Sequence, residues 1–179
     1  MTKNKYWWMA IASTAGLGAS FIQLLEKLSL LKNPHATLSC NLNSVFSCSN
    51  ILNAWQSSAF GFPNAVIGII MFTFFLTAAL FMLTGSSLAK RFAFTIQGLA
   101  VFMLAFTLWV FYENTFSSKA VCIFCLVNGT SVLVINAVMK RHNFAANPRF
   151  KKYFQNGTDY FLWAALWLAV AFVMVLKLH

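Results

Sequence analysis

Long apolar runs separated by short polar segments dominate this chain. Five of the runs approach the roughly 20 residues that a helix needs to cross a bilayer. They cover residues 7–25, 65–83, 92–111, 121–139 and 160–176, and none of them contains a Lys, Arg, Asp or Glu. The last run is at the lower limit of spanning length. The pattern therefore predicts an all-α integral membrane protein in which a fifth spanning helix follows four others.

The first run has two interpretations. Lysines precede it and small residues lie along it, as in a cleaved signal peptide. However, the run continues to Leu25, which is long for the apolar part of such a peptide. Ala12, Gly16 and Ser20 also recur at four-residue spacing, a pattern typical of closely packed helices in a bilayer. We therefore expect a retained helix.

Composition excludes an ordinary soluble domain, and charge sets the orientation. Charged residues make up 9% of the chain, against about 25% in a typical soluble domain. With the N-terminus in the cytoplasm, the inner segments carry Lys3, Lys5, Lys90, Arg91, Lys140, Arg141, Arg149, Lys151 and Lys152, and the outer segments carry Lys27, Lys32, Lys119 and Lys177. This excess of inner basic residues follows the positive-inside rule. The net charge of +10 is thus explained by the orientation of the chain in a plasma (inner) membrane, and it does not indicate a nucleic-acid partner.

The predicted topology brings the four cysteines to one side of the membrane. Cys40 and Cys48 lie in the first outer loop, and Cys122 and Cys125 lie at the outer end of the fourth span. The outer side is oxidising, so disulfides form and persist there. Hydropathy and charge alone therefore predict that all four cysteines meet on the oxidising side of the membrane.

Cys122 and Cys125 form a C-x-x-C motif at the start of a helix. We expect Cys122 in the first turn, where the helix dipole and nearby Lys119 favour the thiolate. Cys125 lies ~4.5 Å deeper, because the rise is about 1.5 Å per residue. Cys122 could then exchange with Cys48 or Cys40, and Cys125 could react with a lipid-soluble oxidant. A quinone fits, because it takes up the two electrons and two protons of a dithiol without a metal or flavin.

Three other interpretations use the same cysteines. They could form two structural disulfides in a non-catalytic membrane scaffold, or they could be unrelated buried residues. They could also bind zinc, although seven residues separate Cys40 from Cys48, and structural zinc motifs usually have about two to four between paired ligands.

The sequence resembles the vitamin K epoxide reductase family, especially its bacterial members, over residues from roughly 10 to 140. The resemblance rests on the segment CNLNSVFSC at 40–48, the segment FGFPN at 60–64, and C-x-x-C on the fourth helix. It implies a four-helix bundle around a quinone, capped on the outer side by a short half-helix at residues 49–58. Residues 1–139 would form this core with its outer loop 26–64, residues 140–159 a basic cytoplasmic loop, and residues 160–179 an additional transmembrane helix.

The same resemblance implies a role for each cysteine. Cys122 and Cys125 would be the active-site pair, and Cys40 and Cys48 a shuttle pair. Cys48 would form the transient bond to Cys122, Cys125 would face the quinone, and Cys40 would be attacked by a thioredoxin-fold protein supplied in trans.

Candidate quinone-binding residues follow from the family pattern. Asn64 aligns with a position that hydrogen-bonds a quinone oxygen, although Asn is also a favoured helix N-cap. Phe60 and Phe62 could wall the ring, although aromatic residues at a membrane boundary are also common anchors. Two departures, Ala54 in place of a hydroxyl residue and Gly129 in place of a tyrosine, argue against vitamin K epoxide as substrate. Ser57 or Ser58 could supply the missing hydroxyl.

We therefore expect a membrane thiol:quinone oxidoreductase that supports disulfide formation in exported proteins. Its acceptor would be a ubiquinone, menaquinone or vitamin K type quinone. The alternatives are a vitamin K quinone or epoxide reductase that runs with a reduced partner, and the disulfide-stapled scaffold.

Overall fold

The computed structural model describes residues 4–34, 36, 38–41, 47–118 and 121–144, together with residues 165, 168, 169 and 172. Every element within these residues is helical. In chain order the elements are α1 (Asn4–Lys32), α2 (Cys48–Asn53), η1 (Trp55–Ser58), α3 (Asn64–Leu83), α4 (Lys90–Glu113), η2 (Asn114–Ser118) and α5 (Ile123–Phe144).

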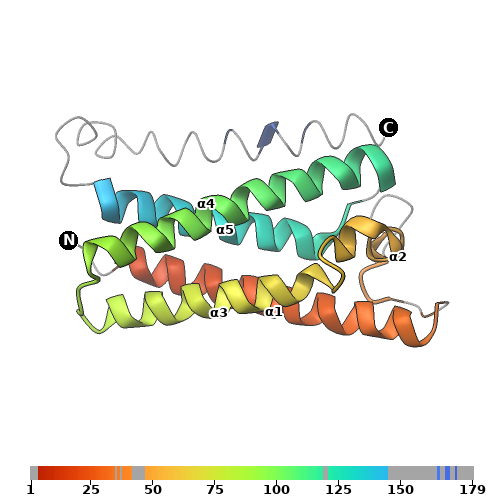
Figure 1. Cartoon of the computed structure of the whole chain (residues 1–179), viewed down its shortest axis with the longest axis horizontal. Coiled ribbons are helices and arrows are strands. Elements are labelled where there is room, and N and C mark those ends of the chain that lie inside the picture. The colour runs from red at the N-terminus through yellow and green to blue at the C-terminus, as the bar shows by residue number, and fades with distance from the viewer. Residues whose placement is uncertain are drawn as a thin grey trace.

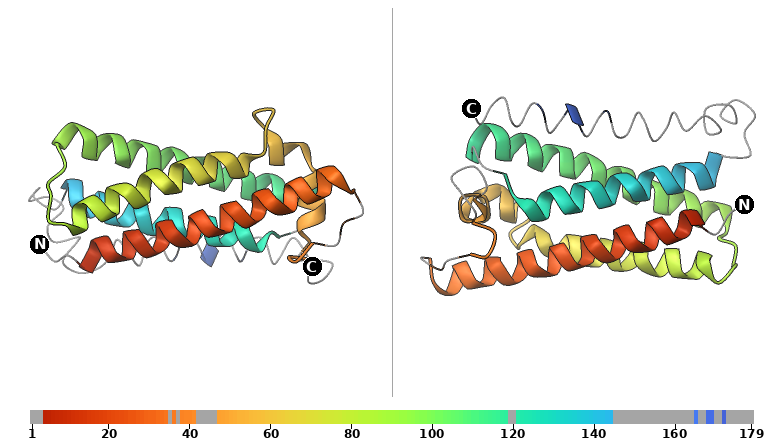
Figure 2. Two further views of the ribbon diagram at one scale, coloured as in Figure 1. Left: turned by 90° about the horizontal axis from the view of Figure 1, so that it is seen from below. Right: turned by 180° about the vertical axis from the view of Figure 1, so that it is seen from behind.

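Four of the described helices are long and apolar enough to cross a membrane. They are α1, α3, α4 with the turn that follows it, and α5, and they lie side by side in a bundle (Figures 1 and 2). The prediction of an all-α membrane bundle is therefore confirmed. Most of the proposed fifth span at 160–176 and most of the loop at 140–159 lie outside the described residues.

Two of the predicted boundaries were too short. α1 continues to Lys32, so the segment assigned to the start of the outer loop is helical. Leu30 explains this extension, because it is 4% exposed and packs in the cluster around the cysteines. α5 continues to Phe144. Basic residues such as Arg141 lie in its last turn, where their positive charge interacts favourably with the negative end of the helix dipole.

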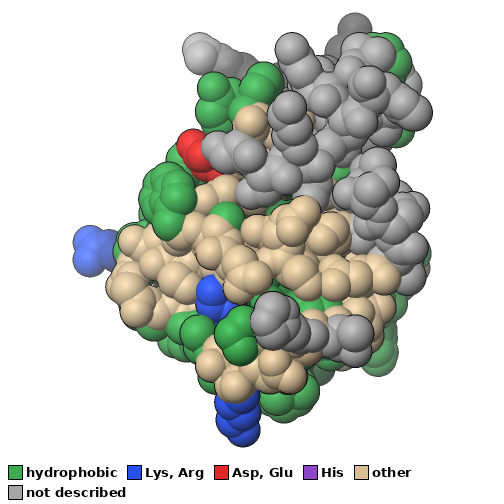
Figure 3. Space-filling model, turned by 90° about the vertical axis from the view of Figure 1, so that its right-hand side faces the viewer, with side chains coloured by type: hydrophobic (Ala, Val, Ile, Leu, Met, Phe, Trp, Pro, Cys, Tyr) green, Lys and Arg blue, Asp and Glu red, His purple; other side chains and the backbone are tan. Residues whose placement is uncertain are grey.

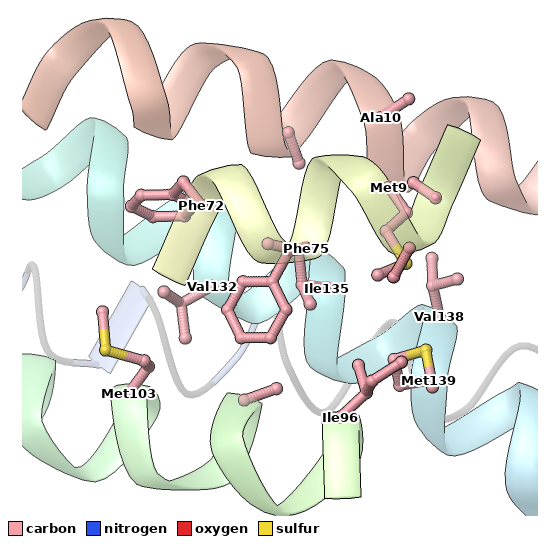
Figure 4. Close-up of a cluster of buried hydrophobic side chains, with 14 of the residues drawn as sticks. Met9, Ala10, Phe72, Phe75, Ile96, Met103, Val132, Ile135, Val138 and Met139 are labelled. Carbon is pink, nitrogen blue, oxygen red and sulfur yellow. The ribbon is translucent and has the colours of Figure 1, made fainter. Parts of the chain in front are cut away.

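Small residues allow α1 and α3 to approach closely, as the sequence predicted. A Cβ atom added to Gly16 would overlap the ring of Phe72, and one added to Gly68 would overlap the hydroxyl of Ser20. In a bilayer such contacts drive helix association, because lipid tails are as apolar as the side chains. The core beside this contact is filled by Phe72, Phe75 and residues of α4 and α5 (Figure 4).

The bundle has two distinct ends. At one end, the Tyr6 hydroxyl lies 2.8 Å from Nδ1 of His142, which joins the start of α1 to the end of α5. At the other end α2 and η1 form a cap (Figure 1). Figure 3 views this second end, where charged side chains are sparse among the residues shown in colour.

The cap is the predicted half-helix, broken into two pieces. The chain is extended at Ala54, with φ −70° and ψ 148°, so α2 ends there and η1 begins. The Ser57 hydroxyl donates to the carbonyl of Leu52 at 2.7 Å across this break. Lys27 of α1 donates to the same carbonyl and to Ser57 Oγ. Ser57 thus joins α2 to η1 beside Ala54, and Lys27 ties the cap to the bundle.

Candidate active site

The four cysteines meet beneath the cap. Cys40 and Cys48 form a disulfide, and Cys122 and Cys125 are free thiols. The sulfur of Cys48 lies 3.8 Å from that of Cys122. All four side chains are buried, with exposures between 0% and 9%. Two pairs that are distant in the sequence are therefore in contact, and an intramolecular exchange needs only a small movement.

Two polar contacts hold the loop that carries the disulfide. The amide of Asn41 donates to Ser49 Oγ at 2.6 Å, and its Oδ1 accepts the backbone N–H of Ser49 at 3.2 Å. On the preceding side, the carboxylate of Glu26 accepts hydrogen bonds from the backbone N–H and the hydroxyl of Ser39. Because both contacts lie next to a cysteine, they fix the position of the Cys40–Cys48 bond.

Cys122 precedes α5 and does not lie in its first turn, which corrects our expectation. Its carbonyl accepts the N–H of Leu126 at 3.2 Å, so Cys122 is the N-cap residue. The Cys125 thiol and the backbone N–H groups of Cys125 and Phe124 donate to its sulfur. The bond from the Cys125 thiol, with these N–H groups, lowers the pKa of Cys122 although burial opposes the shift. Lys119, the other expected cause, lies outside the described residues.

Cys125 faces a cavity among the helices. The cavity has a volume of about 70 Å³. A single water molecule needs roughly 10–15 Å³, so the cavity is larger than a water site. Its lining is Ser20, Gln23, Ile51, Gln56, Ser57, Asn64, Ala65, Gly68, Phe72, Met103, Phe106, Thr107, Val110, Phe111, Asn114, Cys125, Asn128 and Val132. Cys122 is not part of this lining. The two thiols of the C-x-x-C motif therefore meet different surroundings.

Polar groups of α1 and α5 line one wall of this cavity. Nε2 of Gln23 lies 3.8 Å from the Cys125 sulfur, and the Ser20 hydroxyl lies 3.4 Å from Oδ1 of Asn128. Glutamine and serine inside an apolar run gave no signal of this kind in the sequence. Their position follows from helix pairing, because they share the face of α1 that packs on α5.

Asn64 lies in the cavity wall, and its amide is engaged by the cap. Its Nδ2 donates to the carbonyl of Gln56 at 2.6 Å, and its Oδ1 accepts the N–H of Ala59 at 3.2 Å. Asn64 is the first residue of α3 and makes no cap to its own helix, since Pro63 holds the N-cap position. The expected alternative role as an N-cap is therefore wrong, and Asn64 instead holds η1 against α3.

Phe60 and Phe62 lie outside the cavity lining. They are 55% and 43% exposed. The ring of Phe60 packs at 5.9 Å from that of Phe106, which does line the cavity. Phe106, on α4, thus lines the cavity together with Phe72 and Phe111, and the sequence did not distinguish these three among 20 phenylalanines.

A family comparison agrees with this arrangement. The model of the vitamin K epoxide reductase family matches residues 7–140, which contain all four cysteines and all four long helices except the start of α1 and the last turn of α5. The chain belongs to the vitamin K epoxide reductase family. No curated protein matched the chain in a separate search.

Membership makes this vitamin K epoxide reductase homologue a membrane oxidoreductase. Members of the family are generally quinone-linked and typically work with thiol redox partners. The residues that the structure describes include no cluster of three or more His, Cys, Asp or Glu that could hold a metal ion.

Proposed function

We propose that this vitamin K epoxide reductase homologue is a thiol:quinone oxidoreductase. One observation carries the proposal: Cys122 contacts the loop disulfide, whereas Cys125 lines the cavity. The Cys122–Cys125 pair thereby connects the loop disulfide to the cavity. A thiol pair with only a structural role has no need for this division.

The cavity suits the head group of a quinone. Phe72, Phe106 and Val132 give it apolar walls on three helices, as the ring of a quinone requires. Amide groups in the same wall can hydrogen-bond the oxygen atoms of the ring. When bound, a quinone would supply an acceptor for two electrons and two protons, which is the yield of one dithiol.

The relay begins at the loop disulfide. A thiolate of a thioredoxin-fold partner attacks Cys40, which breaks the Cys40–Cys48 bond and leaves Cys48 as the thiolate. The second partner thiol then attacks the mixed disulfide, and the oxidised partner leaves. The loop pair now holds two electrons, and the partner has gained a disulfide.

The second exchange moves these electrons to the active-site pair. Cys48 attacks Cys122 of an oxidised Cys122–Cys125 bond, and Cys125 leaves as the thiolate. Cys40 then attacks Cys48, which restores the loop disulfide and releases Cys122. Transfer of two electrons and two protons to the quinone re-forms the Cys122–Cys125 bond and closes the cycle.

The redox state in the structure is one step of this cycle. The loop pair is oxidised and the active-site pair is reduced, which is the state that follows the second exchange. In this state the lowered pKa of Cys122 favours its thiolate, and Cys125 lies at the cavity. The pair is then ready to deliver its electrons to the acceptor.

A partner that reaches Cys40 must displace part of the loop. Cys40 is 4% exposed and packs with Leu30, Leu38 and Ile51. A thioredoxin-fold protein in trans could bind this end of the bundle and open it. With the cysteines on the outer side of the plasma membrane, the reaction would form disulfides in exported proteins.

The test is quinone reduction by the purified protein, with dithiothreitol as electron donor. We expect the wild type to reduce an analogue of ubiquinone or of menaquinone. Cys125→Ala should lose at least about a thousandfold of the rate, because the thiol at the cavity is gone. Cys40→Ala should keep most of the rate, because a small reductant can act on Cys122 directly.

Two results would contradict the proposal. A wild type that reduces neither analogue points instead to a disulfide-stapled scaffold or to another substrate. Equal rates in the wild type and in Cys125→Ala would show that the reduction does not pass through the cavity thiol.

A further inference from the structure

The end of α4 carries a buried amide without a protein partner. Asn114 is 2% exposed, and neither its Nδ2 nor its Oδ1 makes a hydrogen bond. Leaving an amide buried and unpaired is costly, so such groups are rare in native structures. The side chain of Asn114 lines the same cavity as Cys125.

Backbone geometry places Asn114 at this position. It is the first residue of η2, a turn wider than the α-helix that precedes it, and wide turns of this kind are frequent at functional sites. The next residue, Thr115, is also buried, but its hydroxyl donates to the carbonyl of Phe111 at 2.8 Å. Two adjacent polar side chains thus differ: one is satisfied within its own helix and the other faces the cavity.

Other polar groups in the cavity wall have partners within the protein. Both ends of the Asn64 amide bond the backbone of the cap, and Ser20 bonds Asn128. Elsewhere in the described residues, the buried polar atoms without a partner are Ser13 Oγ and Gln97 Oε1, and neither residue lines the cavity. Among the described residues that line the cavity, Asn114 is therefore the one with fully buried polar side-chain atoms that have no partner in the protein.

We propose that Asn114 binds the head group of the quinone, an inference that rests on the function proposed above. Its Nδ2 donates a hydrogen bond to a carbonyl oxygen of the quinone, and its Oδ1 accepts one from a hydroxyl of the quinol. An amide carries both groups without a change of charge. The same residue can thus hold the acceptor before reduction and the product after it.

The inference is tested by equilibrium binding of decylubiquinone to protein in which all four cysteines are oxidised, so that no turnover occurs. Asn114→Leu keeps the size of the side chain and removes its hydrogen bonds. We expect the dissociation constant to rise about tenfold, which corresponds to about 1.4 kcal/mol. The midpoint of thermal unfolding without quinone should stay the same or rise, because no protein contact is lost.

Two further variants make the result specific. Asn114→Ala removes the amide without adding bulk, and it should weaken binding to a similar extent. Thr115→Val is the matched control: it changes a neighbouring buried side chain that is bonded within its helix, and it should leave the dissociation constant unchanged.

The outcomes separate this inference from the proposed function. If wild-type protein reduces decylubiquinone and the Asn114 variants bind it as tightly as wild type does, the role of Asn114 is wrong and the function stands. If both variants lose affinity together with thermal stability, Asn114 is structural and the inference is also wrong. If the wild type neither binds nor reduces the quinone, the proposed function fails and the inference with it.

Discussion

The two ends of the bundle are built differently. Away from the cysteines, α1, α3, α4 and α5 are regular, and their core side chains, such as Phe75, Ile96, Ile135 and Met139, are fully buried. At the cysteine end the chain breaks into α2, η1 and η2, and a cavity opens between the helices. The two ends thus differ in where the helices stop.

This difference has a physical cause. A continuous helix satisfies its own backbone, which a membrane requires, and it leaves only packing to be solved. A helix start leaves N–H groups without intrahelical partners. In this protein two of those groups, at the start of α5, donate to the sulfur of Cys122. The reactive cysteines therefore lie where regular helices end, and the regular end of the bundle holds them in position.

The largest effect should come from the contact between Cys48 and Cys122. In the double variant Cys40→Ala, Cys125→Ala, each remaining thiol has lost its usual partner, and the two sulfurs lie 3.8 Å apart in the wild type. We expect mild oxidation to convert nearly all of this variant to a Cys48–Cys122 disulfide. Peptide mass mapping without reductant measures the product.

The reciprocal double variant is the control for this disulfide-trapping experiment. Cys48→Ala, Cys122→Ala leaves Cys40 and Cys125, which belong to the partner and cavity ends of the proposed relay. It should form almost no intramolecular disulfide. Equal yields in the two variants would mean that the observed contact does not select the route of exchange.

A second, smaller effect tests the regular part of the bundle. Gly16→Val should lower the free energy of unfolding by about 1–3 kcal/mol, because the added atoms overlap the ring of Phe72 in a packed interface. Gly18→Val is the matched control two residues away, where an added Cβ meets nothing within 4 Å. Unfolding by titration with a denaturing detergent measures the free energy of unfolding of both variants. A loss at Gly18 as large as that at Gly16 would refute the packing role of the small-residue pattern.

The sequence predicted the regular part of this molecule well. Apolar runs of spanning length marked α1, α3, α4 and α5, because a bilayer admits few other solutions. The spacing of Ala12, Gly16 and Ser20 indicated the packed face of α1. Alternation of the spans then placed all four cysteines at one end, which the contact between Cys48 and Cys122 confirms.

The irregular part was less predictable, because it depends on contacts between distant residues. The family pattern named Asn64, but only the structure shows that the cap engages its amide. Phe60 and Phe62 were chosen for their place in a motif, whereas Phe106 lines the cavity because of the rotation of α4. Asn114 gave no signal, since one asparagine near the end of a helix is ordinary until its lack of a partner is seen.

The smallest expected effect concerns the pH at which Cys122 becomes a thiolate. The hydrogen bond from the Cys125 thiol is the largest cause of its lowered pKa. The thiolate, which is the reactive form, should therefore appear at a lower pH than in an ordinary cysteine and disappear below that pH. Cys125→Ala removes the main cause, so its titration should move to higher pH. Thiolate absorbance at 240 nm, taken as the difference from Cys122→Ser, measures the titration of Cys122. A midpoint in wild type no lower than that of an ordinary cysteine, or one that Cys125→Ala leaves unmoved, would show that the end of α5 does not tune this thiol.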